Sequence, residues 1–390
     1  MAISFNDIPA ALRTPGAFIE FDNSLAGATG FMHKILVIVQ KLATGTQAEG
    51  EPVRVTQAQQ AVDYFGQGSM GAAMFKALLK ANRDTEVWAI ALDDNGAGSA
   101  ATGQLSVDAV PTAAGTLSLY IAGQRVQIAI TASQTVAAIA TALAAAINAD
   151  ADLPVTAAVN GVDNFKVDIT ANHKGEVAND IDLRFGYYSD EQLPTGLTIG
   201  ITAMNGGAGN PDISTALIAM GDEWWNYIIM PYTDGANMTA LEAELTDRWG
   251  PMRQIDGRAF AAFRGTHAET GTFGDGNNCP HVSYIGTGKA PEPPYIWAAV
   301  NGAVAAKSLA IDPARPLQTL VLKGLKPPAL KDRWIREERN LLLYDGISTY
   351  TIDAGGLVRI ERQITSYQKN ASGLPDASYL DINTPETLSR

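Results

Sequence analysis

Residues 274–281 hold the side chains that a cysteine nucleophile requires, because Asp275, Cys279 and His281 lie within one short stretch. Such a nucleophile needs a thiolate of low pKa beside a histidine that acts as base. Pro280 stands between the two and keeps the backbone extended, which works against the two side chains facing each other. We therefore predict a buried, unreactive cysteine at the start of a strand. Two such ligands also leave a tetrahedral metal site incomplete.

The four histidines, His33, His173, His267 and His281, are the candidates for the base of a serine hydrolase. That chemistry needs a serine nucleophile, a histidine and a carboxylate that orients the histidine. None of the histidines lies in a Gly-x-Ser-x-Gly elbow, and Ser69 is better explained as the N-cap of a helix. We therefore predict that the protein is not an enzyme and assign no catalytic, cofactor-binding or metal-binding residue. An α/β hydrolase is the distant alternative.

Two glycine-rich stretches, 96–98 and 206–209, have the composition of phosphate-binding loops. Neither contains the Gly-Lys-Ser/Thr sequence that places a lysine on a phosphate. Asp93 and Asp94 offer carboxylates to calcium, but the spacing of an EF-hand is missing. We predict linkers for the two glycine stretches and the polar end of a strand for the two aspartates.

The composition excludes several classes of partner. The chain has 390 residues with 28 basic and 41 acidic side chains, which gives a net charge of −13. Such a field repels nucleic acid and anionic membrane surfaces. The single cysteine fits a reducing compartment, the first residues do not resemble a signal peptide, and the apolar runs are shorter than the ~18–20 residues that span a bilayer. We expect a soluble protein made in the cytoplasm. Charged residues are only 18% of the chain, against about 25% in ordinary domains, which is typical of a surface that other protein covers.

The elements that position these side chains begin with an α/β pattern over residues 1–95. Continuous apolar runs at 35–39 and 87–92 predict strands that are buried on both faces. Helices are expected between them, over 56–65 and after Ser69. This order implies a right-handed crossover and a largely parallel sheet.

Residues 96–205 have a different character. Strands are predicted at 116–121, 124–130 and 164–170, with a helix that Ser133 caps. This stretch carries ten acids and four bases, a net charge of −6, and glycine-rich linkers flank it on both sides. We predict an inserted α+β domain at the periphery of the molecule.

The α/β pattern resumes after Pro211, with strands predicted at 227–230, 259–263 and 281–285 and helices at 213–225, 238–249 and 295–309. Hairpin strands are predicted in the tail at 341–344, 348–352 and 357–365. The predicted fold is an α/β core, with a mixed and largely parallel sheet and C-terminal hairpin strands, plus the inserted small α+β domain. Its parts are an N-terminal arm and first strand (1–25), a discontinuous core domain (26–95 plus 206–390) and the insertion (96–205).

Several segments spread over the whole chain resemble one protein family. They are residues 8–20 with Arg13-Thr14-Pro15-Gly16, residues 173–181 with His173-Lys174-Gly175-Glu176, 230–234, 247–254, 339–350 and 359–368. In these segments the chain resembles the tail sheath proteins of contractile-tailed bacteriophages, most closely those of Mu-like phages.

The resemblance implies a structural subunit without a cofactor. Its partners would be neighbouring sheath subunits in six-fold rings, the tail tube protein, and the baseplate and tail terminator proteins, with no nucleic acid and no membrane. Contraction of the sheath would drive the tube through the host envelope. The expected location is the virion, after assembly in the host cytoplasm. A sheath subunit of a related phage-tail-like bacteriocin is the nearest alternative.

Sheath subunits of this family are linked by extended terminal arms that add strands to a neighbour's sheet. The candidate contact residues are Phe5, Phe18, Ile19 and Phe21 near the N-terminus, and Arg333, Trp334 and Arg336 in a charged stretch. A solvated helix is the alternative for residues 331–339. Of Trp224 and Trp225, we expect one to face a partner. Members of the family usually continue beyond the region that matches 381–384, so we expect either a truncated chain or a short variant.

Overall fold

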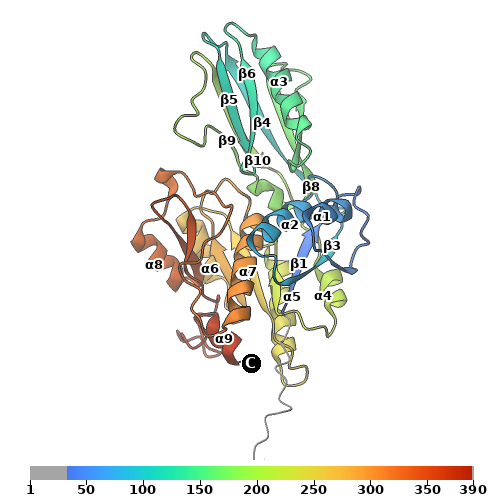
Figure 1. Cartoon of the computed structure of the whole chain (residues 1–390), viewed down its shortest axis with the longest axis vertical. Helices are drawn as coiled ribbons and strands as arrows, with labels where there is room; N and C mark the ends of the chain where they lie inside the picture. Colours follow the sequence, from blue (N-terminus) through green and yellow to red (C-terminus); the bar gives the residue numbers. More distant parts are fainter. Residues whose placement is uncertain (1–32, 389–390) are drawn as a thin grey trace, which may run out of the picture. The chain divides into compact units, whose positions relative to one another are not determined.

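The computed structural model describes residues 33–388, and an eight-stranded sheet forms its centre (Figure 1). The order of the strands is β15-β14-β13-β12-β11-β1-β3-β2. Their bounds are β1 (Lys34–Gln40), β2 (Pro52–Arg54), β3 (Glu86–Leu92), β11 (Tyr227–Ile229), β12 (Arg258–Phe263), β13 (Val282–Gly286), β14 (Ile347–Ile352) and β15 (Val358–Arg362). The six inner strands are parallel, and β2 and β15 add antiparallel strands at the two edges. The predicted mixed and largely parallel sheet is confirmed.

The inner strands are largely buried on both faces, because helices cover them. Residues 35–39 in β1 have no exposed side-chain surface, as the continuous aliphatic run predicts. The helices of this part are α1 (Ala58–Phe65), α2 (Met70–Ala81), α4 (Ser214–Met220), α5 (Gly235–Trp249), α6 (His267–Asp275), α7 (Pro294–Ile311), α8 (Arg336–Tyr344) and α9 (Asn383–Leu388), with short 3₁₀ turns such as η2 (Leu330–Asp332).

Helices α2 and α7 pack against each other and against the sheet (Figure 1). Ser69 caps α2 as predicted, because its Oγ accepts a hydrogen bond of 3.0 Å from the amide of Ala72. Gly302 lets α7 approach the sheet closely, since a Cβ at this position would lie 2.9 Å from the side chain of Ile229. We call residues 33–95 and 206–388, with their common hydrophobic interior, the α/β core.

Residues 100–205 form two antiparallel sheets and one long helix, which we call the 100–205 segment. One sheet has the order β10-β4-β8-β7 and the other β6-β5-β9. The elements are β4 (Ala100–Ala109), β5 (Gly115–Ile121), β6 (Gln124–Ile130), α3 (Val136–Ala149), β7 (Val155–Val159), β8 (Lys166–Lys174), η1 (Glu176–Asp180), β9 (Leu183–Phe185) and β10 (Thr198–Asn205). Strands such as β6 alternate exposed and buried side chains, and the buried ones form a hydrophobic cluster with α3. This cluster shares no residue with that of the α/β core.

The predicted hairpin between β5 and β6 is present, and its two turn residues explain why it forms. Ala122 and Gly123 have φ values of +51° and +77°, the left-handed conformation at both positions that a two-residue type I′ hairpin requires. The predicted cap of α3 is wrong, however. Thr135, and not Ser133, accepts the hydrogen bond from the helix amide of Ala138, at 3.3 Å.

Two predicted elements of the α/β core are also corrected. Residues 341–344 end helix α8 and do not form a strand. The polar residues before them belong to the same helix, and at its start the Ile335 amide donates a hydrogen bond of 2.8 Å to Glu338 Oε2. The prediction was wrong because a four-residue apolar run carries no periodicity that separates a strand from a helix. Helix α4 ends at Met220 rather than near 225, because Gly221 turns the chain at a φ of +48°.

Within residues 33–388, no helix combines the length and the apolar character that crossing a membrane requires.

Candidate interaction surfaces and the joint of the 100–205 segment

The residues that suggested cysteine chemistry are buried in the α/β core. Cys279 is 3% exposed, which confirms the predicted buried cysteine. Burial raises the pKa of its thiol to about 12. Burial and the neighbouring Arg258 guanidinium lower the pKa of His281 to about 3, and Arg258 donates a hydrogen bond of 3.1 Å to His281 Nδ1. Both shifts favour the neutral forms, which opposes the thiolate–imidazolium pair that a cysteine nucleophile needs.

The two glycine-rich stretches lie side by side where the chain enters and leaves the 100–205 segment. Ser99 and Ala208 pair as an antiparallel bridge, with N–O distances of 2.9 and 3.2 Å between their backbones. A Cβ on Gly98 would lie 2.7 Å from the carbonyl oxygen of Gly209, so the two backbones are in direct contact and leave no room for a side chain there. These stretches act as paired connections, in keeping with the linkers predicted for them.

Around these connections, His173 joins the 100–205 segment to the α/β core. Its Nε2 accepts a hydrogen bond of 3.0 Å from the Met70 amide, at the first residue of α2, and its Nδ1 lies 2.9 Å from Asp94 Oδ1. Because Nε2 is an acceptor, Nδ1 carries the proton and donates it to Asp94. Asp94 also accepts from Gln40 Nε2 at 2.6 Å. Burial acts to raise the pKa of Asp94, but these hydrogen bonds outweigh it and lower the pKa below its usual value.

Charged side chains make a second contact between the two regions. Asp182, beside β9, accepts a hydrogen bond of 2.6 Å from Arg264, which follows β12, and also pairs with Arg184. Arg184 in turn donates to the Lys289 carbonyl at 3.0 Å. Nearby Asp180 is crowded by protein, and burial raises its pKa to about 6, while Arg264 acts in the opposite direction.

A third contact lies under the β5–β6 turn. Lys326 Nζ donates 2.7 Å to the Gly123 carbonyl and lies 3.4 Å from Glu292 Oε1, while the Lys326 amide donates to Glu292 Oε2 at 3.0 Å. Burial raises the pKa of Glu292, and Lys326 opposes that shift. Polar and charged groups make these three contacts, and Val177 of η1 adds an apolar one, because it packs into the hydrophobic cluster of the α/β core.

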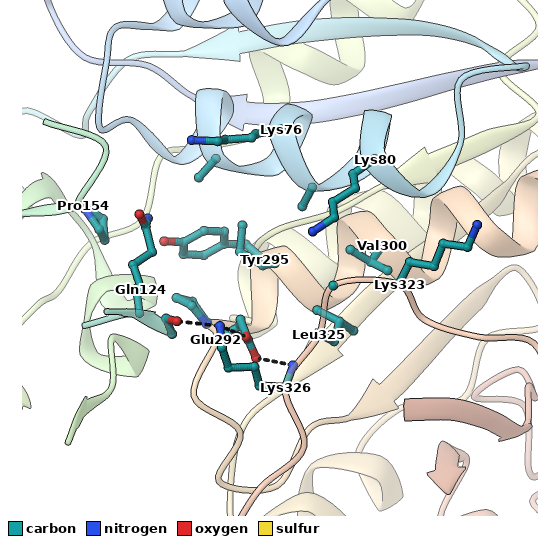
Figure 2. Close-up of a pocket in the computed structure, with 17 residues that line it drawn as sticks. Lys76, Lys80, Gln124, Pro154, Glu292, Tyr295, Val300, Lys323, Leu325 and Lys326 are labelled. Carbon is teal, nitrogen blue, oxygen red and sulfur yellow. Dashed lines mark hydrogen bonds and ion pairs between the residues drawn. The ribbon is translucent and has the colours of Figure 1, made fainter. Parts of the chain in front are cut away.

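Beside the third contact is a hollow of about 280 Å³, formed by α2, the start of α7, the β5–β6 turn and the loop at 323–326. Figure 2 shows Lys76 and Lys80 of α2 on one side, Lys323 and Lys326 on the other, and Tyr295 between them. We call it the lysine-lined hollow. The lysines were not identified from the sequence, although the i, i+4 spacing of Lys76 and Lys80 was the available signal.

A second surface, which we call the α8 surface, exposes apolar side chains. Ile335, Leu341 and Tyr344 are 59%, 54% and 76% exposed. Tyr344 also lines a hollow of about 530 Å³ between α8 and residues 362–380. We treat these side chains as a candidate interaction surface, since exposed apolar area is what contacts between proteins bury.

The candidate contact residues differ in their placement. Phe5, Phe18, Ile19 and Phe21 lie outside the described residues. Arg336 is exposed at the start of α8, and Arg333 donates 3.0 Å to the Pro328 carbonyl.

Trp334 lies partly buried above Gly286, where an added Cβ would meet its ring at 2.8 Å, and its ring centroid is 6.1 Å from that of Tyr350. This packing gives Trp334 a structural role. Trp225 is 3% exposed, whereas Trp224 is 38% exposed and its indole donates to Asp256 at 2.7 Å.

Charge and geometry also limit what the surfaces can bind. Among residues 33–388, no three His, Cys, Asp or Glu side chains come together as a group that could hold a metal ion. Asp94, one of the two aspartates considered for calcium, is instead part of the joint.

Comparison with known proteins places the chain. Residues 206–366 match the family described as "Phage tail sheath protein central domain". The Mu-like prophage FluMu tail sheath protein of Haemophilus influenzae is 49% identical over 391 residues, an alignment that covers 100% of this chain and 80% of the relative.

Two solved structures are also similar. The sheath tail protein of Listeria innocua has 14% identity and a TM-score of 0.47, over 92% of this chain and 74% of that protein. The sheath tail protein of Desulfitobacterium hafniense has 14% identity and a TM-score of 0.48, over 96% and 80%. Because both TM-scores are below 0.5, these structures do not decide the family, and the family assignment rests on the sequence relative alone. Since that relative matches this chain along its whole length at 49% identity, the chain belongs to the family of phage tail sheath proteins, as a relative of those of Mu-like prophages.

Proposed function

We propose that this chain is the structural subunit of a contractile tail sheath. Subunits stack as six-fold rings around the inner tail tube, and contraction of the stack drives the tube through the host envelope. The observation that carries the proposal is the 49% identity to a Mu-like prophage tail sheath protein across all of this chain. The work is done by assembly and rearrangement, and no reaction is part of it.

The surface of the protein supports a role in assembly. Charged residues are only 18% of the chain, so little of the surface requires contact with water. The α8 surface, with Ile335, Leu341 and Tyr344, supplies apolar area that a neighbouring subunit would bury. Arg333, Trp334 and Arg336 adjoin this surface, and we assign them to the same contact, with Trp334 as its packed base.

The N-terminal arm, residues 1–25, would make the second kind of contact. Phe18, Ile19 and Phe21 belong to a strand that is added to a neighbour's sheet, and Phe5 lies further along the arm. A strand of about five residues makes about four or five main-chain hydrogen bonds, each contributing roughly 0.5–1.5 kcal/mol. Main-chain pairing keeps subunits connected while their folded bodies rotate.

We further propose that residues 96–205 form a peripheral domain on the outside of the sheath, and that residues 26–95 and 206–390 form its wall. The separate hydrophobic cluster, the polar contacts at the joint and the net charge of −6 support this division. The remaining partners would be the tail tube, baseplate and tail terminator proteins, in a virion whose tail is assembled in the host cytoplasm.

Electron microscopy of the purified chain, alone and mixed with a full-length Mu-like sheath protein, tests this function. We expect rings or tubes. Removal of residues 1–22 should leave circular dichroism unchanged and prevent the chain from joining tubes. A variant with Phe18, Ile19 and Phe21 replaced by serine should behave like the deletion, while Asn6→Ser serves as the matched control. The proposal would be contradicted by a chain that stays monomeric both alone and in the mixture, or by a deletion variant that forms normal tubes.

A further inference from the structure

The lysine-lined hollow combines an apolar floor with a positive rim. Ala73 and Ala77 of α2 face Tyr295, Ile296 and Val300 of α7 across it. The volume of about 280 Å³ admits a few side chains and not a whole helix. An occupant that fits both features is a short segment whose apolar side chain is flanked by carboxylates.

Within the described part of the chain, two of the four lysines form ion pairs, and two do not. Lys76 pairs with Asp152 at 2.5 Å and Lys326 with Glu292 at 3.4 Å. For Lys80 and Lys323, none of the carboxylates in residues 33–388 lies within ion-pair distance. The rim therefore keeps two positive charges on a protein whose net charge is −13.

The backbone holds the two sides of the rim close together. Gly324 has a φ of +92°, and an added Cβ there would lie 3.4 Å from Lys80 Nζ. Glycine thus lets the loop bring Lys323 near α2, and Figure 2 shows Lys80 and Lys323 on opposite sides of the same hollow.

We propose that the lysine-lined hollow is a docking site for an acidic segment of a second copy of this chain. The proposal rests on the sheath function above. Subunits with 41 acidic and 28 basic side chains repel one another on average, so their contacts favour places where basic groups meet a neighbour's acids. Lys80 and Lys323 bind the carboxylates, and the apolar floor receives the adjoining side chain.

Charge reversal is the first test. Lys80→Glu combined with Lys323→Glu should raise the protein concentration needed for assembly about tenfold at low salt, because attraction becomes repulsion, and the difference should shrink as salt screens it. Lys80→Arg with Lys323→Arg should assemble normally, and so should Lys289→Glu, an exposed lysine outside the hollow. All variants should unfold at the same temperature as the original chain, since these side chains are exposed.

Photo-crosslinking identifies the occupant. A benzoylphenylalanine at position 323, in assemblies mixed from isotope-labelled and unlabelled chains, should give crosslinks between copies to a peptide rich in Asp and Glu. Crosslinks only within one chain, normal assembly of the double glutamate variant, or binding of a small anion such as citrate without any effect on assembly would each overturn the proposal. Failure of the original chain to assemble at all would contradict the sheath function itself, which separates the two outcomes.

Discussion

The α/β core and the 100–205 segment bury their apolar side chains in different ways. In the core, inner strands such as β1 and β13 are buried on both faces and lie under helices. In the segment, β6 and β8 alternate buried and exposed side chains, and one helix, α3, covers the sheets. The first arrangement needs helices on both faces of its sheet, while the second leaves one face of its sheets to solvent.

The contact between these regions resembles neither of them. His173 with Asp94, Asp182 with Arg264, and Lys326 with the Gly123 carbonyl are polar, and Val177 is the residue of the segment that joins the hydrophobic cluster of the core. Polar contacts hold a fixed geometry but contribute less stability than apolar burial, because each replaces a hydrogen bond to water. The difference teaches that each region is stabilised mainly from within, and that the joint sets the orientation of one against the other.

A pair of cavity-forming substitutions, one in each region, should give the largest effect and tests whether the two regions are stabilised independently. Phe260→Ala in the core should lower the free energy of unfolding by about 3–5 kcal/mol, and Leu143→Ala in the segment should lower it by about 2–5 kcal/mol. Both residues are deeply buried, with exposed fractions of 0% and 1%. Hydrogen exchange should show that Phe260→Ala loosens the amides of β12 and not those of β8, with the reverse for Leu143→Ala. Equal loosening of both regions by either change would show one cooperative unit.

A pH series at the joint gives the next largest effect. Burial raises the pKa of Asp180 to about 6 from its ordinary 3.8, so the folded state binds this proton more tightly than the unfolded state. Its contribution is favourable at low pH and is lost as the pH rises through about 6. Asp180→Asn should therefore stabilise the protein by up to about 3 kcal/mol at pH 8 and change little at pH 3.

Urea unfolding at pH 3, 5 and 8 measures this difference. Asp190→Asn, at an exposed aspartate of the same segment, is the control and should show no such trend. If Asp180→Asn raised the free energy of unfolding equally at all three pH values, the stabilisation would come from packing and not from the charge of Asp180.

The two regions also differ in how well the sequence predicts them. The run at 35–39 is rich in β-branched residues and 124–130 alternates with period two, and both strands form where expected. The run at 341–344 has no period, and the capping hydrogen bond of Glu338 decides in favour of a helix. Ser133 and Thr135 are both good caps, but Ser133 has a left-handed backbone with a φ of +64°, whereas Thr135 has the extended backbone of an N-cap.

The candidate surfaces were the least predictable part. His173 and Asp94 are 79 positions apart, and so their contact follows from how the 100–205 segment packs against the core. The lysine-lined hollow joins residues from α2, the β5–β6 turn, the start of α7 and the 323–326 loop, four parts of the chain without a shared local pattern. By contrast, the resemblance to sheath proteins depends on local segments, and the 49% identical relative confirms it.

The helix caps give the smallest expected difference between the regions. Ser69 of α2 is fully buried and its hydrogen bond measures 3.0 Å, whereas Thr135 of α3 is exposed and its bond measures 3.3 Å. Ser69→Ala should cost about 1–2 kcal/mol and Thr135→Ala about 0.5 kcal/mol. Thermal unfolding of the two variants tests this ranking of stability losses. A larger loss of stability for Thr135→Ala than for Ser69→Ala would contradict it.

Removal of residues 99–208 tests the central claim most directly. Gly98 and Gly209 already lie against each other, so a two-residue Gly-Ser link should close the gap with little strain. Under the conditions in which the intact chain forms tubes, we expect electron microscopy to show tubes with the same wall and a smaller outer diameter. Aggregation of the shortened chain, or the loss of its tubes, would show that the 100–205 segment is an integral part of the sheath wall.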